Sequence, residues 1–355
     1  MLSHTRLTLS LLTTLLLTAM PGSQALAATP LTPSGKPATA KAGSKTTDED
    51  VIAARNSIRQ EGLEATVREL AKPKYNGRLP GTEGDTLSRD WLVKQFEAIG
   101  LTPAGSKGYL QPFTTRITDP DESSNLQLGQ KANTSNIIGI LPGNDPELAK
   151  EVIIISGHRD HLGFNNDLRK QYPGANDDLT GVAATLELAR AFAKLEGQNK
   201  RTLMFVAYGA EEQKYMGSIY HSQNPVAAAP NAQIVLMISI DMIGLGYDKW
   251  QSFSQKQMDA YSKRWFREVY NDSDEDKDAY SHEYPKTPGP TFDYDAGPFA
   301  RIGINTRVIG LADVPNYHSV NDTPDNVHFK PMVNVTRTLF DYLWQVDQDD
   351  QPHTR

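Results

Sequence analysis

The sequence contains no cysteine, no excess of positive charge and, after residue 27, no long hydrophobic run. Without cysteine, thiolate catalysis, disulfide bonds and Cys-ligated zinc are excluded, so any metal must be held by histidines and carboxylates. The net charge of −7 argues against a general nucleic-acid-binding protein, and no nucleic-acid partner is expected. The remaining composition, 38% hydrophobic and 22% charged, is ordinary for a globular protein with one large core.

Residues 1–27 are predicted to form a signal peptide. A short leader with Arg6 precedes an apolar stretch at 7–20, and Ala25-Leu26-Ala27 fits a small-residue cleavage site. The apolar stretch is too short to span a membrane comfortably, so we expect cleavage and no stable membrane association afterwards. The predicted location is secreted or periplasmic. Residues 28–49 are rich in Ala, Thr, Pro and Lys and are predicted to be a disordered linker.

Strands and helices are predicted to alternate through residues 50–346, which favours a single domain. Predicted strands lie at 136–141, 152–155, 201–207, 234–240 and 304–309, with two more strand-like runs within 110–130. Predicted helices lie at 50–70, 84–99, 179–195 and 331–346. This alternation indicates an α/β protein, a three-layer α/β/α sandwich with a mixed, mostly parallel central sheet. A polar excursion at 247–290 and a polar tail at 347–355 complete the chain.

The stretch EVIIISGHRDHLG, residues 151–163, organises the predicted site. A buried β-branched run at 152–155 ends in His158, Asp160 and His161. The segment GANDDLTG follows and precedes a predicted helix. Active sites of open α/β sheets lie at the carboxyl ends of the strands, which favours a functional site here. A polar loop with an Asp that caps the following helix would explain GANDDLTG equally well.

Further candidate ligands follow the other predicted strands or lie in loops. In chain order the candidates are His158, Asp177, Glu211-Glu212, Asp241 and His318. Nitrogen and carboxylate ligands without sulfur suit zinc, and five ligands can serve two ions if one carboxylate bridges them. Because neighbouring side chains in extended backbone point opposite ways, one glutamate of the pair can bind metal while the other acts as a general base.

The motifs GHxDH, GANDD…G, GAEE, DMIG and YHSVNDTPD occur in this order. Together they resemble the co-catalytic di-zinc aminopeptidases of metallopeptidase clan MH, such as aminopeptidase Y and the bacterial leucyl aminopeptidases. The resemblance extends from about Tyr75 to about Trp344 and implies two zinc ions per chain. By position, Asp177 would be the bridging ligand, His158 and Asp241 would complete one site, and Glu212 and His318 would complete the other.

The resemblance also implies roles for residues around the metals. Glu211 would be the general base, Asp160 would orient the His158 ring, and Tyr317 would help to polarise the scissile carbonyl. Asp178 would follow a cis peptide bond. For His161, a supporting or structural role is favoured over a role as a ligand.

Two positions depart from the commoner family pattern. Arg159 lies between His158 and Asp160, and Ala296 stands where many relatives carry histidine before Pro-Phe. Both departures predict altered contacts to the substrate side chain. Only about 110 residues separate the linker from His158, which leaves little room for an inserted protease-associated domain.

The function implied by the resemblance is that of a zinc-dependent aminopeptidase, which hydrolyses peptides at a free N-terminus. A single-zinc enzyme like glutaminyl cyclase and a non-catalytic, receptor-type binding domain are the alternatives. Two bound metals with hydrolysis would indicate the aminopeptidase, and one metal with cyclisation would indicate the cyclase-like enzyme. Neither metal nor turnover would indicate the binding domain. The sequence leaves open the preferred N-terminal residue and the oligomeric state.

Overall fold

A computed structural model describes residues 47–117, 129–195, 197–245, 294–310 and 315–351. The predicted signal peptide, all but the end of the linker and the excursion at 247–290 lie outside this part. In the described part, none of the helices combines the length and apolar character needed to cross a membrane.

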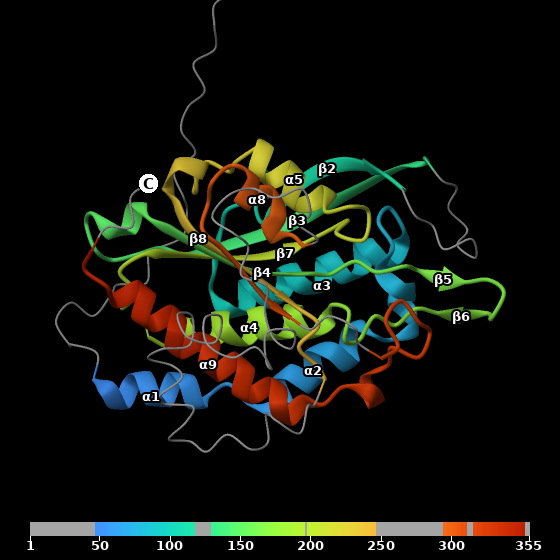
Figure 1. Cartoon of the computed structure of the whole chain (residues 1–355), viewed down its shortest axis with the longest axis horizontal. Helices are drawn as coiled ribbons and strands as arrows, with labels where there is room; N and C mark the ends of the chain where they lie inside the picture. The colour runs from blue at the N-terminus through green and yellow to red at the C-terminus, as the bar shows by residue number, and fades with distance from the viewer. Residues whose placement is uncertain (1–46, 118–128, 196, 246–293, 311–314, 352–355) are drawn as a thin grey trace, which may run out of the picture. The chain divides into compact units, whose positions relative to one another are not determined.

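A seven-stranded mixed sheet forms the centre of the described chain (Figure 1). Its strands are β1 (Thr102–Pro103), β2 (Leu110–Arg116), β3 (Lys131–Leu141), β4 (Val152–His158), β7 (Thr202–Tyr208), β8 (Ile234–Asp241) and β9 (Thr306–Gly310). The order is β1-β3-β7-β4-β8-β9, with β2 also paired to β3. Strands β7, β4, β8 and β9 run parallel, while β1, β2 and β7 pair antiparallel with β3. The four parallel strands therefore bring their carboxyl ends to one edge.

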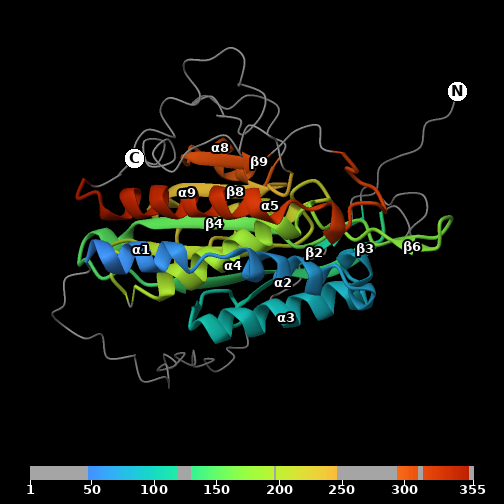
Figure 2. The ribbon, with the colours of Figure 1, turned by 90° about the horizontal axis from the view of Figure 1, so that it is seen from below.

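Helices cover both faces of this sheet, above and below the strands in Figure 1, and Figure 2 looks onto the lower face. Strand β4 alternates between two cores: Ile153 and Ile155 pack with the helices α2 (Gln60–Leu70), α3 (Glu83–Ile99), α4 (Leu179–Ala193) and α9 (Phe329–Gln348). Val152 and Ile154 pack on the opposite face with α8 (Ala296–Arg301), and α5 (Met216–Gln223) contacts α8 on that side. Successive side chains of a strand point to opposite faces of the sheet, so the unbroken apolar run of β4 places apolar side chains on both faces. A strand that is buried on both sides requires this pattern. The predicted three-layer sandwich is confirmed.

The single helix predicted for 50–70 is wrong. The segment forms α1 (Asp48–Asn56) and then α2, so α1 begins inside the predicted linker. Thr47 caps α1 by accepting a hydrogen bond from the Asp50 amide. Arg337 of α9 donates hydrogen bonds to the carbonyls of Asn56 and Ile58, at 3.3 and 2.9 Å, and so satisfies backbone groups that the break leaves free.

The predicted polar tail is held by the fold as far as Gln351. Helix α9 continues to Gln348, and the buried Arg201 donates hydrogen bonds to the carbonyls of Asp349 and Gln351, each at 2.8 Å. The guanidinium also contacts the Glu151 carboxylate at 2.7 Å. The chain beyond α9 is therefore attached to the start of β4 and β7.

Candidate metal centre

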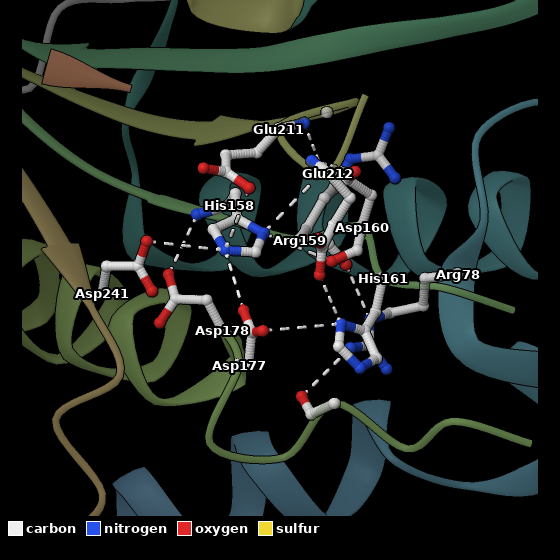
Figure 3. A network of polar contacts seen from close by, with 12 residues as sticks. Arg78, His158, Arg159, Asp160, His161, Asp177, Asp178, Glu211, Glu212 and Asp241 are labelled. Carbon is white, nitrogen blue, oxygen red and sulfur yellow. Dashed lines mark hydrogen bonds and ion pairs between the residues drawn. The ribbon is translucent and has the colours of Figure 1, made fainter. Parts of the chain in front are cut away.

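Four of the predicted ligands, His158, Asp177, Glu212 and Asp241, lie together at the carboxyl edge of the parallel strands (Figure 3). His158 is the last residue of β4 and Asp241 the last residue of β8, so the sheet itself places these two side chains. Glu212 lies in the turn after β7, Asp177 in the loop before α4, and His318 in the loop before α9. The structure brings together all five residues, as the sequence predicted.

Asp177 presents one oxygen to each half of the site. Its Oδ1 lies 3.1 Å from Nε2 of His158, and that same nitrogen is 3.7 Å from Oδ2 of Asp241. Its Oδ2 lies 3.5 Å from Nε2 of His318, which is 3.0 Å from Oε2 of Glu212. We call His158 with Asp241 the strand-end side and Glu212 with His318 the loop side.

These distances and the unpaired atoms fit metal ions. Bonds of about 2.0–2.1 Å in tetrahedral geometry place neighbouring ligand atoms roughly 3.3 Å apart, and the four distances straddle that value. Oδ2 of Asp177 and Oδ1 of Asp241 are buried without a hydrogen-bond partner among the described residues. Burial lowers the pKa of His158, but the negative charges of Glu211 and Asp241 outweigh it and raise that pKa well above its ordinary value. The cluster therefore favours positive charge at its centre.

Asp178 lies close enough to His158 and Asp241 to be a ligand, but its oxygens are already used. Oδ2 accepts a hydrogen bond from the His158 amide at 3.1 Å. Oδ1 accepts from the amides of Gly181 and Met242, at 2.9 and 3.1 Å. Asp178 thus joins the end of β4, the end of β8 and the start of α4. The peptide bond between Asp177 and Asp178 is cis, as the family resemblance implied.

The expected contact between Asp160 and the His158 ring is not the main one. The Asp160 carboxylate lies 3.9 Å from Nδ1 of His158, whereas the Asp160 carbonyl oxygen is 3.3 Å from that nitrogen. The carboxylate instead accepts hydrogen bonds from the amides of Glu211 and Glu212, at 3.0 and 3.2 Å. Because the chain turns sharply after β7, two amides point the same way, and Asp160 satisfies both.

Asp322 performs a similar task that the sequence patterns did not reveal. Its two oxygens accept hydrogen bonds from the amides of Asn176 and Asp177, at 2.8 and 3.0 Å. Asp322 belongs to the same loop as His318, so that loop is attached directly to Asp177. Its place in the YHSVNDTPD motif was visible in the sequence, but its partner depends on the folded loops.

Glu211 lies beside the strand-end side, with Oε2 3.7 Å from Nε2 of His158. Burial raises the pKa of Glu211 well above its ordinary value, despite the opposing charge of His158. A carboxyl group with a raised pKa accepts a proton more readily than an ordinary glutamate, as a general base must. The position and the environment agree with the predicted general base.

Tyr317 is 54% exposed, and its ring stacks on His318 with centroids 3.8 Å apart. Burial raises its pKa, and the carboxylates of the site raise it further. Its phenol therefore keeps its proton at neutral pH and can donate a hydrogen bond near the loop side.

At the two departures from the family pattern, the side chains of Arg159 and Ala296 are fully buried. The altered contacts to the substrate side chain stay a prediction. Arg159 forms an ion pair with Asp85 and donates a hydrogen bond to the Ser135 carbonyl at 2.9 Å. Ala296 is the first residue of α8 and packs in the core on that face of the sheet.

A second buried arginine, Arg78, binds backbone carbonyls of the site. It donates to Arg159 at 2.6 Å, Pro173 at 2.8 Å, Gly174 at 3.1 Å and Leu70 at 3.1 Å. Burial lowers its pKa to about 10, so it stays charged at neutral pH. Arg78 thereby holds the loop that carries Asp177 against the end of β4.

The match to known families covers the strands and loops that carry these residues. The model of peptidase family M28 matches residues 136–343, which is more than half of the chain. The chain belongs to peptidase family M28. All five predicted ligands and Glu211 lie inside the matched region.

The curated relatives that the chain matches are distant and longer. The chain is 29% identical over 205 residues to a probable zinc metalloprotease of Pyrenophora teres f. teres, and the match covers 56% of this chain and 41% of the relative. It is 30% identical over 212 residues to a probable zinc metalloprotease of Pyricularia oryzae, covering 56% and 38%. The matches therefore span about two fifths of the relatives' length.

Solved structures share the M28 fold. LapB from Legionella pneumophila superposes with a TM-score of 0.58 at 19% identity, covering 86% of this chain and 76% of that chain. An aminopeptidase from Aneurinibacillus sp. strain AM-1 gives 0.58 at 16% identity, covering 86% and 98%. Glutaminyl cyclase from Porphyromonas gingivalis gives 0.57 at 19% identity, covering 81% and 98%. The fold is thus common to structures named for two different reactions.

Proposed function

We propose that the protein is a zinc-dependent aminopeptidase that holds two zinc ions and removes residues from peptides with a free N-terminus. The proposal rests on one observation: the two carboxylate oxygens of Asp177 face different sets of residues. Oδ1 lies 3.1 Å from Nε2 of His158, and Oδ2 lies 3.5 Å from Nε2 of His318. The relatives named as probable zinc metalloproteases and the structural neighbour named as an aminopeptidase support it. The leader sequence supports a secreted or periplasmic location.

Five residues of this chain would hold the metals: Asp177 as the bridge, His158 and Asp241 on the strand-end side, and Glu212 and His318 on the loop side. Bound there, zinc would acidify water and polarise the peptide carbonyl. Glu211 takes a proton from the water on the strand-end side and returns it to the leaving amine. Tyr317 donates a hydrogen bond to the oxygen of the tetrahedral intermediate.

The proposal is tested by metal analysis together with turnover of aminoacyl-arylamides, their N-acetylated counterparts and a glutaminyl peptide. We expect two zinc ions per chain, hydrolysis of the free-amine substrates, and loss of activity on metal removal with recovery on adding zinc. One zinc with cyclisation of the glutaminyl peptide would support a glutaminyl cyclase instead. Cleavage of the acetylated substrates at an equal rate would overturn the requirement for a free N-terminus.

A further inference from the structure

His161 lies against the loop side but is absent from the proposed ligand set. Its imidazole is fully buried, and Nδ1 lies 2.6 Å from Oε1 of Glu212 (Figure 3). The other oxygen of that carboxylate, Oε2, lies 3.0 Å from Nε2 of His318. The two oxygens of Glu212 therefore have different partners.

The surrounding backbone leaves a space shaped for this ring. Gly174 has a φ of +54°, and a side chain there would meet the ring carbons of His161 at 2.6 Å. Tyr172 directly follows the strand β6 (Lys170–Gln171). Its ring meets the His161 ring edge-on, with the two ring centroids 6.3 Å apart. The position of the imidazole is thus fixed by the loop that leads to Asp177.

The geometry favours a hydrogen bond over direct metal binding. At 2.6 Å, Nδ1 and Oε1 lie much closer than two ligand atoms of one tetrahedral metal, which are roughly 3.3 Å apart, and their separation is that of a short hydrogen bond to a carboxylate. The same nitrogen is 4.0 Å from Oδ2 of Asp177, farther than His318. The atoms of Asp177, Glu212 and His318 already form a compact set without it.

Building on the proposed function, we propose that His161 is a positioning residue that occupies Oε1 of Glu212, so that this carboxylate offers only Oε2 to the loop-side metal. The hydrogen bond fixes the plane of the carboxylate that would hold that metal. Without it, Glu212 would be free to rotate, and the loop-side metal would be held less firmly.

The test compares zinc retention of the wild type, His161→Ala and His161→Asn during equilibrium dialysis against increasing chelator. The amide nitrogen of asparagine can take the place of Nδ1 and donate a hydrogen bond, but it is a poor zinc ligand. His161→Ala should lose one zinc at about 10–100-fold lower chelator concentration, and His161→Asn should recover most of that loss.

His221→Asn is the matched control, because His221 is also a fully buried histidine but bonds to Tyr208, away from the ligands. It should retain zinc like the wild type. If His161→Ala retains zinc equally well, or if His161→Asn is no better than His161→Ala, the positioning role is overturned. The second result would instead favour direct binding by the imidazole.

A measurement on the metal-free protein separates this inference from the proposed function. Proton NMR should show a downfield Nδ1–H resonance that disappears in His161→Asn and shifts in Glu212→Gln. Its absence from the folded, metal-free wild type would overturn the hydrogen bond whether or not the protein binds zinc. A wild type that shows the resonance but binds no zinc would count against the proposed function alone.

Discussion

The two sides of the metal centre are built on different supports. His158 and Asp241 are the last residues of neighbouring parallel strands and are 2% and 4% exposed. Glu212 and His318 lie in loops, and the His318 side chain is 35% exposed. A ligand at a strand end is held by the hydrogen bonds of the sheet, whereas a loop ligand relies on contacts that are specific to that loop.

The contacts that support each side are also separate. Asp178 accepts hydrogen bonds from the amides of His158 and Met242, next to Asp241, on the strand-end side. Asp160 accepts from the amides of Glu211 and Glu212, which include the loop side. The comparison teaches that the strand-end side is preformed by the sheet, whereas the loop side depends on contacts between loops and includes the more exposed His318. Partial chelation should therefore remove the loop-side metal first.

Replacing the predicted base should have the largest effect and leave both sides intact. Glu211→Gln keeps the size of the side chain but cannot accept the proton, so kcat should fall by about 10²–10⁴-fold. Metal content should remain at two per chain, as measured by elemental analysis. The matched variant Glu212→Gln should weaken only the loop-side metal, with activity partly recovered in excess zinc. If Glu211→Gln releases a metal and Glu212→Gln does not, the two roles are reversed.

A buried histidine outside the site should control part of the acid stability. Burial lowers the pKa of His221 to about 4, from an ordinary value of about 6.5 in the unfolded chain. The unfolded state therefore binds the extra proton first, and stability falls as the pH drops from 6.5 to 4. The full effect is about 3 kcal/mol.

His221→Asn should remove this part of the pH dependence. Denaturant unfolding of the wild type and the variant, both with chelator present so that metal loss does not contribute, measures the difference. Parallel stability curves for the two proteins between pH 7 and pH 4 would show that His221 is not buried in its neutral form.

Removing each supporting carboxylate should weaken the metals selectively. Asp178→Asn places an amide beside backbone N–H groups and should lower zinc affinity on the strand-end side by about 10–100-fold. Asp160→Asn should have an effect of the same size on the loop side. Zinc retention during graded chelation distinguishes them: Asp160→Asn should separate the two steps of metal loss further, and Asp178→Asn should bring them together. Identical profiles would mean that the two sides are not supported separately.

The smallest effect should come from the most exposed member of the site. Tyr317→Phe removes the hydroxyl and keeps the ring that stacks on His318. We expect kcat to fall roughly tenfold, below the 10²–10³ typical of a well-ordered oxyanion donor, because the side chain is half exposed. Steady-state kinetics should show the loss in kcat with little change in metal content. A change confined to KM would assign Tyr317 to substrate binding.

The sequence predicted the strand-end side well because it depends on local pattern. The apolar run at 152–155 and the polar residues that follow it are enough to locate the end of β4. The break between α1 and α2 could not be predicted this way, since it involves Arg337, which is far away in sequence. The hydrogen bond that the Asp177 amide donates to Asp322 was missed for the same reason. Such contacts depend on loop conformations that residue patterns do not encode.

Three ligand-bearing segments also contain backbone that patterns do not foretell. Ala210, Met242 and His318 have positive φ values of 61°, 57° and 51° without being glycine. Residues with side chains adopt this region at a cost, which the surrounding structure must offset. His318 is a predicted ligand, Met242 follows one, and Ala210 precedes the predicted base Glu211. The direction of the site side chains at these positions is therefore set by backbone geometry that only the folded protein reveals.

The hydrogen bonds that Arg78 donates to backbone carbonyls show where the folded domain has to begin. The family match starts at residue 136, yet Arg78 binds Arg159, Pro173 and Gly174 inside it. A fragment cut at the family boundary would lose these hydrogen bonds to a charged group, each of which contributes about 1.5–3 kcal/mol. The smallest autonomous folding unit of this protein therefore has to include the segment around Arg78. A domain boundary drawn from the family match alone would divide it.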